Sequence, residues 1–200
     1  SHVTEYFFSK YKNSKIVVYD KITYAANFGY LKAISKSKRF KIVKKDINDT
    51  EALIKETKNV DLLIHLAAES HVDNSFGATK KFIETNVQGT RSVLDACKKN
   101  NIKKIIHVST DEVYGEIYKG CFNENSRFNP SNPYSSSKAA AEMIIKGYQQ
   151  SYNLNVSIVR ANNIFGERQH PEKLIAACCC SILKKKSINL HGSGLQKRTF

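Results

Sequence analysis

Hydrophobic and polar positions follow two alternating patterns along this chain. Short runs of apolar, β-branched residues such as Ile105-Ile106-His107-Val108 are typical of buried strands, whereas apolar residues three or four apart are typical of amphipathic helices. Strands are expected at residues 15–19, 40–44, 61–67, 104–109 and 155–160, and helices at 3–12, 26–36, 50–58, 76–99, 133–152 and 171–186.

This alternation of strand and helix predicts an α/β fold with a doubly wound, Rossmann-like parallel sheet covered by helices on both faces. After about residue 160 the pattern changes to a loop, a helix and a Gly-containing segment. We therefore expect one domain over residues 1–165 and the start of a smaller, ligand-covering region over residues 166–200.

The candidate chemistry gathers where the strand at 104–109 ends. Ser109, Thr110 and two acids are followed by Tyr134 and Lys138, which are four residues apart and share a helix face. A nearby ammonium favours the phenolate, so the pKa of the tyrosine is expected to fall, and the phenol can then take a proton from an alcohol. Such a pair alone occurs by chance on many helices, but its combination with the Ser-Thr strand end predicts redox chemistry on a sugar.

These residues lie in segments that resemble the extended short-chain dehydrogenase/reductase superfamily, and within it the nucleoside-diphosphate-glucose 4,6-dehydratases, most closely the dTDP-glucose type. The Thr-Asp-Glu triplet separates these dehydratases from epimerases, which share Tyr-x-x-x-Lys but lack the acid pair. The resemblance extends over nearly the whole chain, in segments 19–25, 66–73, 84–86, 109–115, 132–134, 171–175 and 191–194.

The resemblance implies NAD-dependent conversion of the substrate to a 4-keto-6-deoxy sugar. Tyr134, assisted by Lys138, takes the C4 hydroxyl proton as hydride leaves C4 for NAD⁺, while Thr110 orients the C4 oxygen. Glu112 then removes the C5 proton, Asp111 protonates the departing C6 hydroxyl, and hydride returns to C6. Adjacent residues of a strand face opposite ways, so both acids reach one substrate only if the chain has left the strand by Thr110.

The resemblance also implies an NAD site. Asp20 would accept hydrogen bonds from ribose hydroxyls and repel a 2′-phosphate, although an Asp closing a strand is also a common turn former. Asp46 and Ile47 resemble an adenine-contacting pair, and the segment 66–68 resembles a small-residue turn beside the cofactor. The expected cofactor-binding residues are Asp20, Lys21, Thr23, Ala25, Asp46, Ile47, Leu66, Ala67, Ala68, Ser70, Thr85, Ser109, Tyr134 and Lys138.

One element of a dinucleotide fold is absent from the sequence, since none of the nine glycines forms a G-x-G-x-x-G turn. The ribose-binding Asp usually lies about 20 residues beyond the first Gly of that turn. We therefore expect the first strand and its Gly-rich turn before Ser1, in a domain that is incomplete at its N-terminus, followed by a region incomplete at its C-terminus. The alternative is a lineage that has lost cofactor binding.

Fewer positions of the sequence match the substrate-binding residues of the family. Phe165, Ala176 and Ala26 replace the family's usual Tyr, Pro and Gly, which leaves the choice between dTDP and UDP open. Arg198 would be a bidentate phosphate ligand. The expected substrate-binding residues are His71, Thr110, Asn163, Glu172, Lys173, Leu174 and Arg198.

Composition narrows the class of protein. The formal charge of +14 allows a polyanionic partner, but the lysines are scattered and lack interleaved aromatic residues, so we expect no nucleic acid partner and an attraction for diphosphate substrates. Five cysteines, three of them contiguous at 178–180, fit neither a disulfide framework nor a metal site, and we expect them reduced and buried. No apolar run is long enough for a membrane span, so a cytoplasmic location is expected.

The expected partners are a nucleoside-diphosphate-hexose substrate and a second copy of the chain, because helices 76–99 and 133–152 resemble those that pair across the dimer in this superfamily. Two alternatives to a dehydratase stay open. One is a nucleotide-sugar epimerase of the same superfamily, which the acid pair disfavours, and the other is a noncatalytic, dimerising interaction protein.

Overall fold

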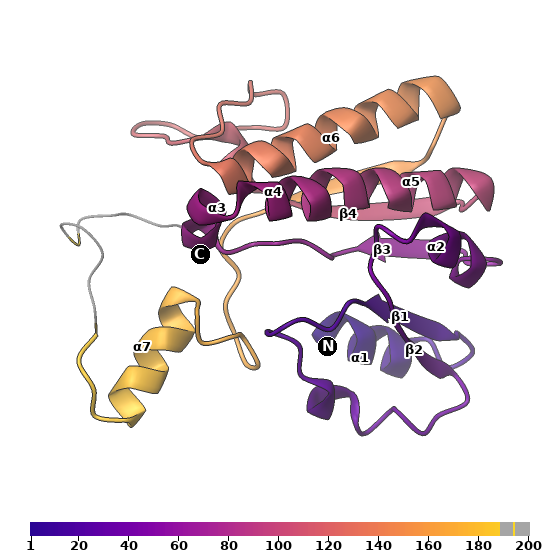
Figure 1. Ribbon diagram of the computed structural model, residues 1–200, viewed down its shortest axis with the longest axis horizontal. Coiled ribbons are helices and arrows are strands. Elements are labelled where there is room, and N and C mark those ends of the chain that lie inside the picture. Colours follow the sequence, from indigo (N-terminus) through magenta and orange to yellow (C-terminus); the bar gives the residue numbers. More distant parts are fainter. Residues whose placement is uncertain (189–193, 195–200) are drawn as a thin grey trace.

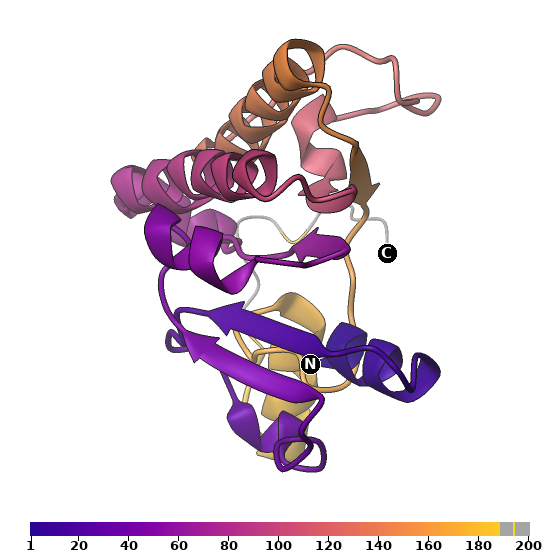
Figure 2. The same ribbon diagram turned by 90° about the vertical axis from the view of Figure 1, so that its right-hand side faces the viewer.

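The computed structural model describes residues 1–188 and 194, and the arrangement of its elements is shown in Figures 1 and 2. The strands are β1 (Ile16–Asp20), β2 (Phe40–Lys44), β3 (Leu62–His65), β4 (Lys104–Thr110) and β5 (Val156–Ala161). The α-helices are α1 (His2–Lys10), α2 (Thr50–Glu56), α3 (Val72–Gly77), α4 (Thr79–Phe82), α5 (Gly89–Lys99), α6 (Pro133–Tyr152) and α7 (Leu174–Leu183). Two 3₁₀ turns, η1 (Phe28–Leu31) and η3 (Asp111–Tyr114), and one π-helix, η2 (Ile83–Gln88), complete the set.

All strand pairs are parallel, which confirms the α/β fold class. The strands form two hydrogen-bonded sheets, one of order β1-β2 and one of order β3-β4-β5. The register places Asp20 opposite Lys44 and Thr110 opposite Ala161, so the carboxyl ends of paired strands coincide. Polar groups that follow these strands therefore share one edge of each sheet.

Within the described residues, the predicted parallel sheet is divided into two parts. Among these residues, β1 pairs with β2 and β3 pairs with β4, and no strand bridges β1 and β3. In a doubly wound sheet of strand order 3-2-1-4-5-6, this break falls at the position of strand 1. The split therefore coincides with the strand that the sequence was expected to lack.

Helix α6 matches its predicted range of 133–152 because both of its ends are specified locally. Asn132 accepts from the Ser135 N–H while the Ser135 hydroxyl bonds the Asn132 backbone, which makes a capping box, and Pro133 occupies the first turn. Asn153 ends the helix in the left-handed conformation, with φ of 54°. These ends fix the axial position of the side chains that α6 carries.

Two predicted helices differ from the structure. Over residues 26–36 only the single turn η1 forms, because Asn27 accepts from the Gly29 N–H and later backbone bonds join residues three apart. Over 76–99 the expected continuous helix is broken at Ala78, which has φ of −135°, and it winds as a π-helix over η2. Figure 1 shows α4, η2 and α5 following one another along α6.

The main core lies between the β3–β5 sheet and helices α2, α5 and α6. Ile105 and Val156 from the sheet pack in one cluster with Leu94 of α5 and Ile145 of α6. Cys97 is fully buried in this cluster, and burial raises the pKa of its thiol to about 12. The expectation that all cysteines are buried is wrong, because Cys121, in the loop after η3, and Cys179, on α7, are exposed.

The C-terminal part leaves β5 and ends in α7, which begins three residues later than predicted and ends three residues earlier, relative to 171–186. Figure 1 shows α7 set apart from the helices that cover β4. The segment that precedes α7 contacts α1. The carbonyl oxygen of Glu167 accepts a hydrogen bond from the His2 side chain, and Arg168 forms an ion pair with Glu5. The division into domains 1–165 and 166–200 stays a prediction.

Candidate active site

The acid pair lies in a turn rather than in the strand. Thr110 is the last residue of β4, and its Oγ1 accepts from the backbone N–H of Glu112 at 3.2 Å, which starts the 3₁₀ turn η3. Gly115 ends the turn with φ of +82°, where a Cβ would lie 2.3 Å from the Asn129 carbonyl oxygen. The chain leaves the strand at the point that the sequence argument required, so Asp111 and Glu112 are no longer on opposite faces of a strand.

Tyr134 and Lys138 come to this turn from the first two turns of α6. Tyr134 and Thr110 share a hydrogen bond, and the Glu112 Oε2 accepts from the side-chain amide of Asn132 at 3.1 Å. The Lys138 Nζ is buried, donates to the Val108 carbonyl oxygen at 2.8 Å and lies 3.5 Å from the His107 Nε2. The structure thus brings together the five predicted catalytic residues, which are Thr110, Asp111, Glu112, Tyr134 and Lys138.

The predicted lowering of the tyrosine pKa is wrong for this structure. Burial raises the pKa of Tyr134 to about 12, and the carboxylates of Glu112 and Asp111 add to that rise against the opposing hydrogen bond from Thr110. Burial lowers the pKa of Lys138 to about 8, and Glu142 opposes this shift. Desolvation therefore disfavours the charged form of both groups of the pair.

Sequence reasoning gave no role to several buried polar residues around the pair. The Asn86 amide, in η2, binds both backbone groups of Glu69 and donates to the Ser137 Oγ at 2.8 Å. The Ser137 hydroxyl in turn donates to the Tyr134 carbonyl oxygen at 2.7 Å. A signal for Asn86 was present, because a polar residue on the apolar side of a predicted helix needs a buried partner.

The ribose and adenine candidates gather at the ends of β1 and β2. Lys21 forms an ion pair with Asp46 at 2.6 Å, next to Asp20. Asp20 is exposed, and its Oδ1 accepts from the Ile22 N–H at 2.6 Å, so it closes a turn while its carboxylate still faces solvent. Thr23 and Ala25 follow in the exposed loop after β1.

Two of the predicted cofactor contacts gain no support. Ile47 is a core residue, 7% exposed, that packs against Gly89, where a Cβ would lie 2.3 Å from the Ile47 Cδ1. The Ser109 hydroxyl faces α6 and donates to the buried carboxylate of Glu142 at 2.5 Å. Side chains alternate along β4, so Ser109 points away from the side of Thr110.

The remaining cofactor candidates lie on or beside the loop that follows β3. Leu66 is 52% exposed at the carboxyl end of that strand, and Ala67 and Ala68 continue the loop with side chains no larger than a methyl group. Thr85 is half-buried in η2, on the helical segment that packs against α6. These positions lie at the same sheet edge as the acid turn.

Substrate candidates that lie more than 100 residues apart in the sequence meet. The Lys173 Nζ donates to the Ser70 carbonyl oxygen at 2.8 Å, and the His71 Nε2 lies 3.2 Å from the Glu172 carbonyl oxygen. The Tyr24 hydroxyl donates to the Glu172 Oε2 at 2.8 Å, which joins the loop after β1 to this contact. Asn163 is half-buried after β5 and Leu174 is 55% exposed at the start of α7, whereas Arg198 lies outside the described residues.

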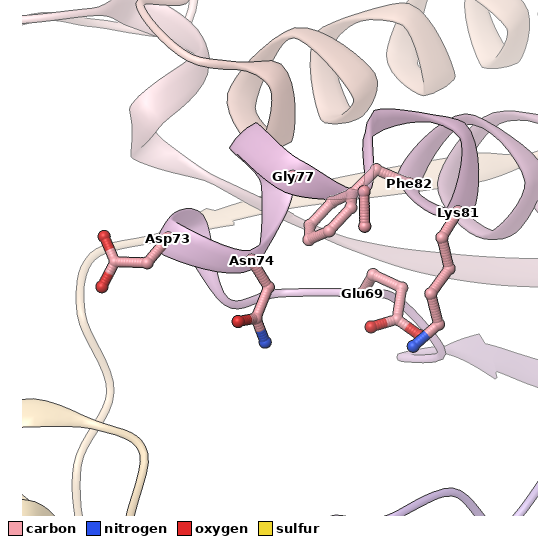
Figure 3. Close-up of a pocket in the computed structure, with 7 residues that line it drawn as sticks. Glu69, Asp73, Asn74, Gly77, Lys81 and Phe82 are labelled. Carbon is pink, nitrogen blue, oxygen red and sulfur yellow. The ribbon is translucent and has the colours of Figure 1, made fainter.

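A cavity of about 400 Å³ opens beside the loop after β3. Figure 3 shows Glu69 and Lys81 reaching toward each other on one wall, where they form an ion pair at 2.8 Å. Phe82, which also lines the cavity, meets the ring of Tyr134 edge to face with centroids 6.3 Å apart. Phe82 thus contacts both the cavity and the ring of Tyr134.

These residues fit part of a dinucleotide. The exposed carboxylate of Asp20 suits ribose hydroxyls, and the small side chains of Ala67 and Ala68 allow close approach of a ligand to the backbone. These residues therefore fit the ribose of a dinucleotide, whereas the 200 residues provide no Gly-rich turn, of the form G-x-G-x-x-G, for its pyrophosphate.

Within residues 1–188 and 194, no three His, Cys, Asp or Glu side chains are grouped so that they could hold a metal ion. In that same part of the chain, no helix combines the length and the apolar character that crossing a bilayer requires.

Comparisons with known proteins agree with this geometry. The family model described as GDP-mannose 4,6 dehydratase matches residues 1–200. The chain is 44% identical over 213 residues to the dTDP-D-glucose 4,6-dehydratase of Dictyostelium discoideum. This alignment covers 100% of the chain and 49% of that relative. The chain therefore spans about half the length of this relative.

Two solved structures place the fold among nucleotide-sugar enzymes. The dTDP-glucose 4,6-dehydratase DesIV of Streptomyces venezuelae, solved with NAD bound, matches with a TM-score of 0.92 and 38% identity over 96% of this chain and 61% of that one. The UDP-glucuronic acid 4-epimerase of Bacillus cereus matches with a TM-score of 0.91 and 27% identity over 98% of this chain and 63% of that one.

Proposed function

This chain belongs to the GDP-mannose 4,6 dehydratase family, and on that basis we propose that it is part of an NAD-dependent nucleoside-diphosphate-glucose 4,6-dehydratase. The proposed substrate is dTDP-glucose and the product is the 4-keto-6-deoxy sugar. Residues 1–165 form the cofactor-binding part in this proposal, and residues 166–200 begin the part that binds the sugar nucleotide.

The observation that carries the proposal is the position of two carboxylates beside the phenol of Tyr134. Asp111 and Glu112 lie in one 3₁₀ turn. The Asp111 Oδ1 accepts from the Thr110 hydroxyl at 3.2 Å, and the Glu112 Oε2 accepts from the amide of Asn132, the cap of the helix on which Tyr134 lies. Oxidation of an alcohol requires a single proton acceptor, whereas elimination of water from the neighbouring carbons also requires a base and an acid. The acid pair provides these two additional groups.

In the proposed reaction each residue moves or holds one proton. Tyr134 accepts the proton of the C4 hydroxyl, and Thr110 donates a hydrogen bond to the C4 oxygen. Glu112 removes the C5 proton, which is acidic beside the C4 ketone, and Asp111 protonates the C6 oxygen as the C6–O bond breaks and water leaves. NAD, when bound, would take hydride from C4 and give it back to C6, and its positive charge would favour the phenolate of Tyr134. Glu112 would return a proton to C5 as C6 receives the hydride.

The proposed partners follow from the same positions. Lys173 and Glu172, joined to the segment at 70–71, would contact the diphosphate and the hexose. A second copy of the chain would pack on α6, where Met143 is 47% exposed, and on η2, where Ile83 is 47% exposed.

The test uses the full-length protein that contains this chain, incubated separately with dTDP-glucose and UDP-glucose. The expected product has lost one water and carries the C4 hydrogen at C6, which mass spectrometry of a C4-deuterated substrate detects. No net reduction of NAD is expected, because the hydride is returned. Unchanged mass with inversion at C4 would instead establish the epimerase, the second candidate, which the similarity to the Bacillus cereus enzyme keeps open.

A further inference from the structure

A buried ion pair lies directly behind the candidate catalytic residues. The Glu142 carboxylate, one turn beyond Lys138 on α6, is 0% exposed and accepts two hydrogen bonds from the Arg160 guanidinium, Nε to Oε2 at 3.0 Å and Nη2 to Oε2 at 2.7 Å. Its Oε1 also accepts from Nε at 3.1 Å and from the Ser109 hydroxyl. The cluster therefore joins α6, the end of β4 and β5 at one carboxylate.

The free side of the same guanidinium reaches the acid turn. The Arg160 Nη1 donates to the hydroxyl of Tyr114, the last residue of η3, and to the Glu124 carbonyl oxygen at 3.2 Å. The guanidinium carbon also lies 5.1 Å from the centre of the Tyr114 ring and 4.9 Å from that of Phe128. Arg160 is thus bonded to the helix that carries Lys138 and to the turn that carries the two acids.

This arrangement uses a property that a lysine would not provide. A guanidinium is planar and donates in several fixed directions, so it can bind a carboxylate along one edge and a second acceptor along another. Neither Arg160 nor Tyr114 lies among the groups assigned to proton transfer. Both hold main-chain segments whose separation sets the distance between Tyr134 and the acid pair.

We infer that Arg160 is a positioning residue that fixes the acid turn relative to α6 through Tyr114, and that it supports the elimination of water more than the first oxidation. The inference rests on the proposed function because it concerns the elimination of water. The contact between Arg160 and η3 does not depend on that function. Loss of the Tyr114 hydroxyl removes the hydrogen bond between Arg160 and η3, while the ion pair with Glu142 and the ring contacts with Arg160 and Phe128 stay in place.

The test compares Tyr114→Phe with a matched control in the full-length protein. The control is Tyr148→Phe, which removes a tyrosine hydroxyl bonded to a carboxylate, Asp95 Oδ1 at 2.7 Å, elsewhere on α6. Tyr114→Phe is expected to slow elimination about fivefold, the change expected for one lost hydrogen bond. Oxidation at C4 and the KM for substrate are expected to change less than twofold, so enzyme-bound NADH accumulates, and Tyr148→Phe leaves this ratio unchanged.

A second measurement does not depend on activity. Hydrogen exchange of the amides at 111–115 is expected to become faster in Tyr114→Phe than in the parent and in Tyr148→Phe. Unchanged exchange, or an unchanged ratio of elimination to oxidation in an active dehydratase, overturns the inference. If exchange is faster in Tyr114→Phe but the parent has no dehydratase activity, the contact between Arg160 and the turn is supported and the proposed function is refuted instead.

Discussion

The Lys138 ammonium donates to the Val108 carbonyl oxygen at 2.8 Å in a position where the lysine is only 4% exposed. This single bond directs a cationic group from α6 toward the end of β4, beside Thr110. The hydrogen bond compensates little of the hydration that the ammonium loses, and burial accordingly lowers the pKa of Lys138 to about 8. Burial of the Lys138 ammonium therefore lowers the free energy of unfolding.

The first prediction concerns that cost. Because the native pKa of about 8 is below the ordinary value of 10.5 for a lysine, the unfolded state binds more protons between these values, and the free energy of unfolding rises with pH through this window. Replacement of Lys138 by Met should remove this rise, which amounts to about 2 kcal/mol between pH 7 and pH 10. Urea unfolding of the parent and the variant at both pH values measures it. Parallel pH dependence in the two proteins would refute the assignment.

The second prediction concerns cofactor choice. Asp20 is exposed at the end of β1, so a complete protein should bind NAD much more tightly than NADP. Asp20→Ala is expected to weaken NAD binding by about 1–3 kcal/mol, the scale for removing one partner of a charge-assisted hydrogen bond. Titration calorimetry with both cofactors provides the measurement.

The control for this prediction is Asp20→Asn. The amide oxygen can still accept from the Ile22 N–H, so the turn after β1 is kept while the negative charge is lost. This variant should bind NADP better than the parent does. Equal affinity of the unmodified protein for the two cofactors would show that Asp20 is only a turn former.

The third prediction concerns the expected dimer. Met143→Glu places a charge on the exposed side of α6 and should convert a dimer of the full-length protein to a monomer in sedimentation velocity experiments. Ile117→Glu is the control, because Ile117 is similarly exposed, at 44%, but lies on the loop after η3. A parent that is monomeric, or a dimer unaffected by Met143→Glu, would exclude α6 as the contact.

Local signals predicted the parts of the fold that are specified locally. The limits of α6 follow from Asn132, Pro133 and Asn153, and the residues of β2 match their predicted range because the strand is a short apolar run between polar turns. The segment at 26–36 was misread because its apolar spacing suits a helix, whereas Asn27 and Gly29 favour a turn. Periodicity does not report such competition between side chain and backbone.

The residues of the candidate site likewise divide into those that local sequence predicts and those that depend on tertiary packing. The acid turn, Tyr134 and Lys138 were predicted from motif and spacing, because each sits at the end of an element. The direction of the tyrosine pKa was not, since it depends on burial and on carboxylates brought near by tertiary packing. Arg160 and Glu142 were missed for a related reason, because they are 18 residues apart in sequence and become partners only when β5 pairs with β4.

The last prediction separates oxidation from elimination. Tyr134→Phe removes the proton acceptor for the first step, so neither bound NADH nor product should form at an appreciable rate. Asp111→Asn combined with Glu112→Gln keeps Tyr134, Lys138 and an acceptor for the Asn132 amide. This double variant should still oxidise C4 and accumulate bound NADH, while elimination falls about a hundredfold or more, as expected for loss of general acid and base groups.

Absorbance of bound NADH and mass spectrometry of the sugar nucleotide follow the two steps separately, and the loss should fall on turnover rather than on KM. Glu116→Gln serves as the control, because Glu116 is near the turn but its carboxylate accepts from the Tyr118 hydroxyl at the surface. That variant should behave as the parent does. If the double variant eliminates water as fast as the parent, Asp111 and Glu112 are only solvated residues of η3, and C4 epimerisation becomes the better account of Tyr134 and Lys138.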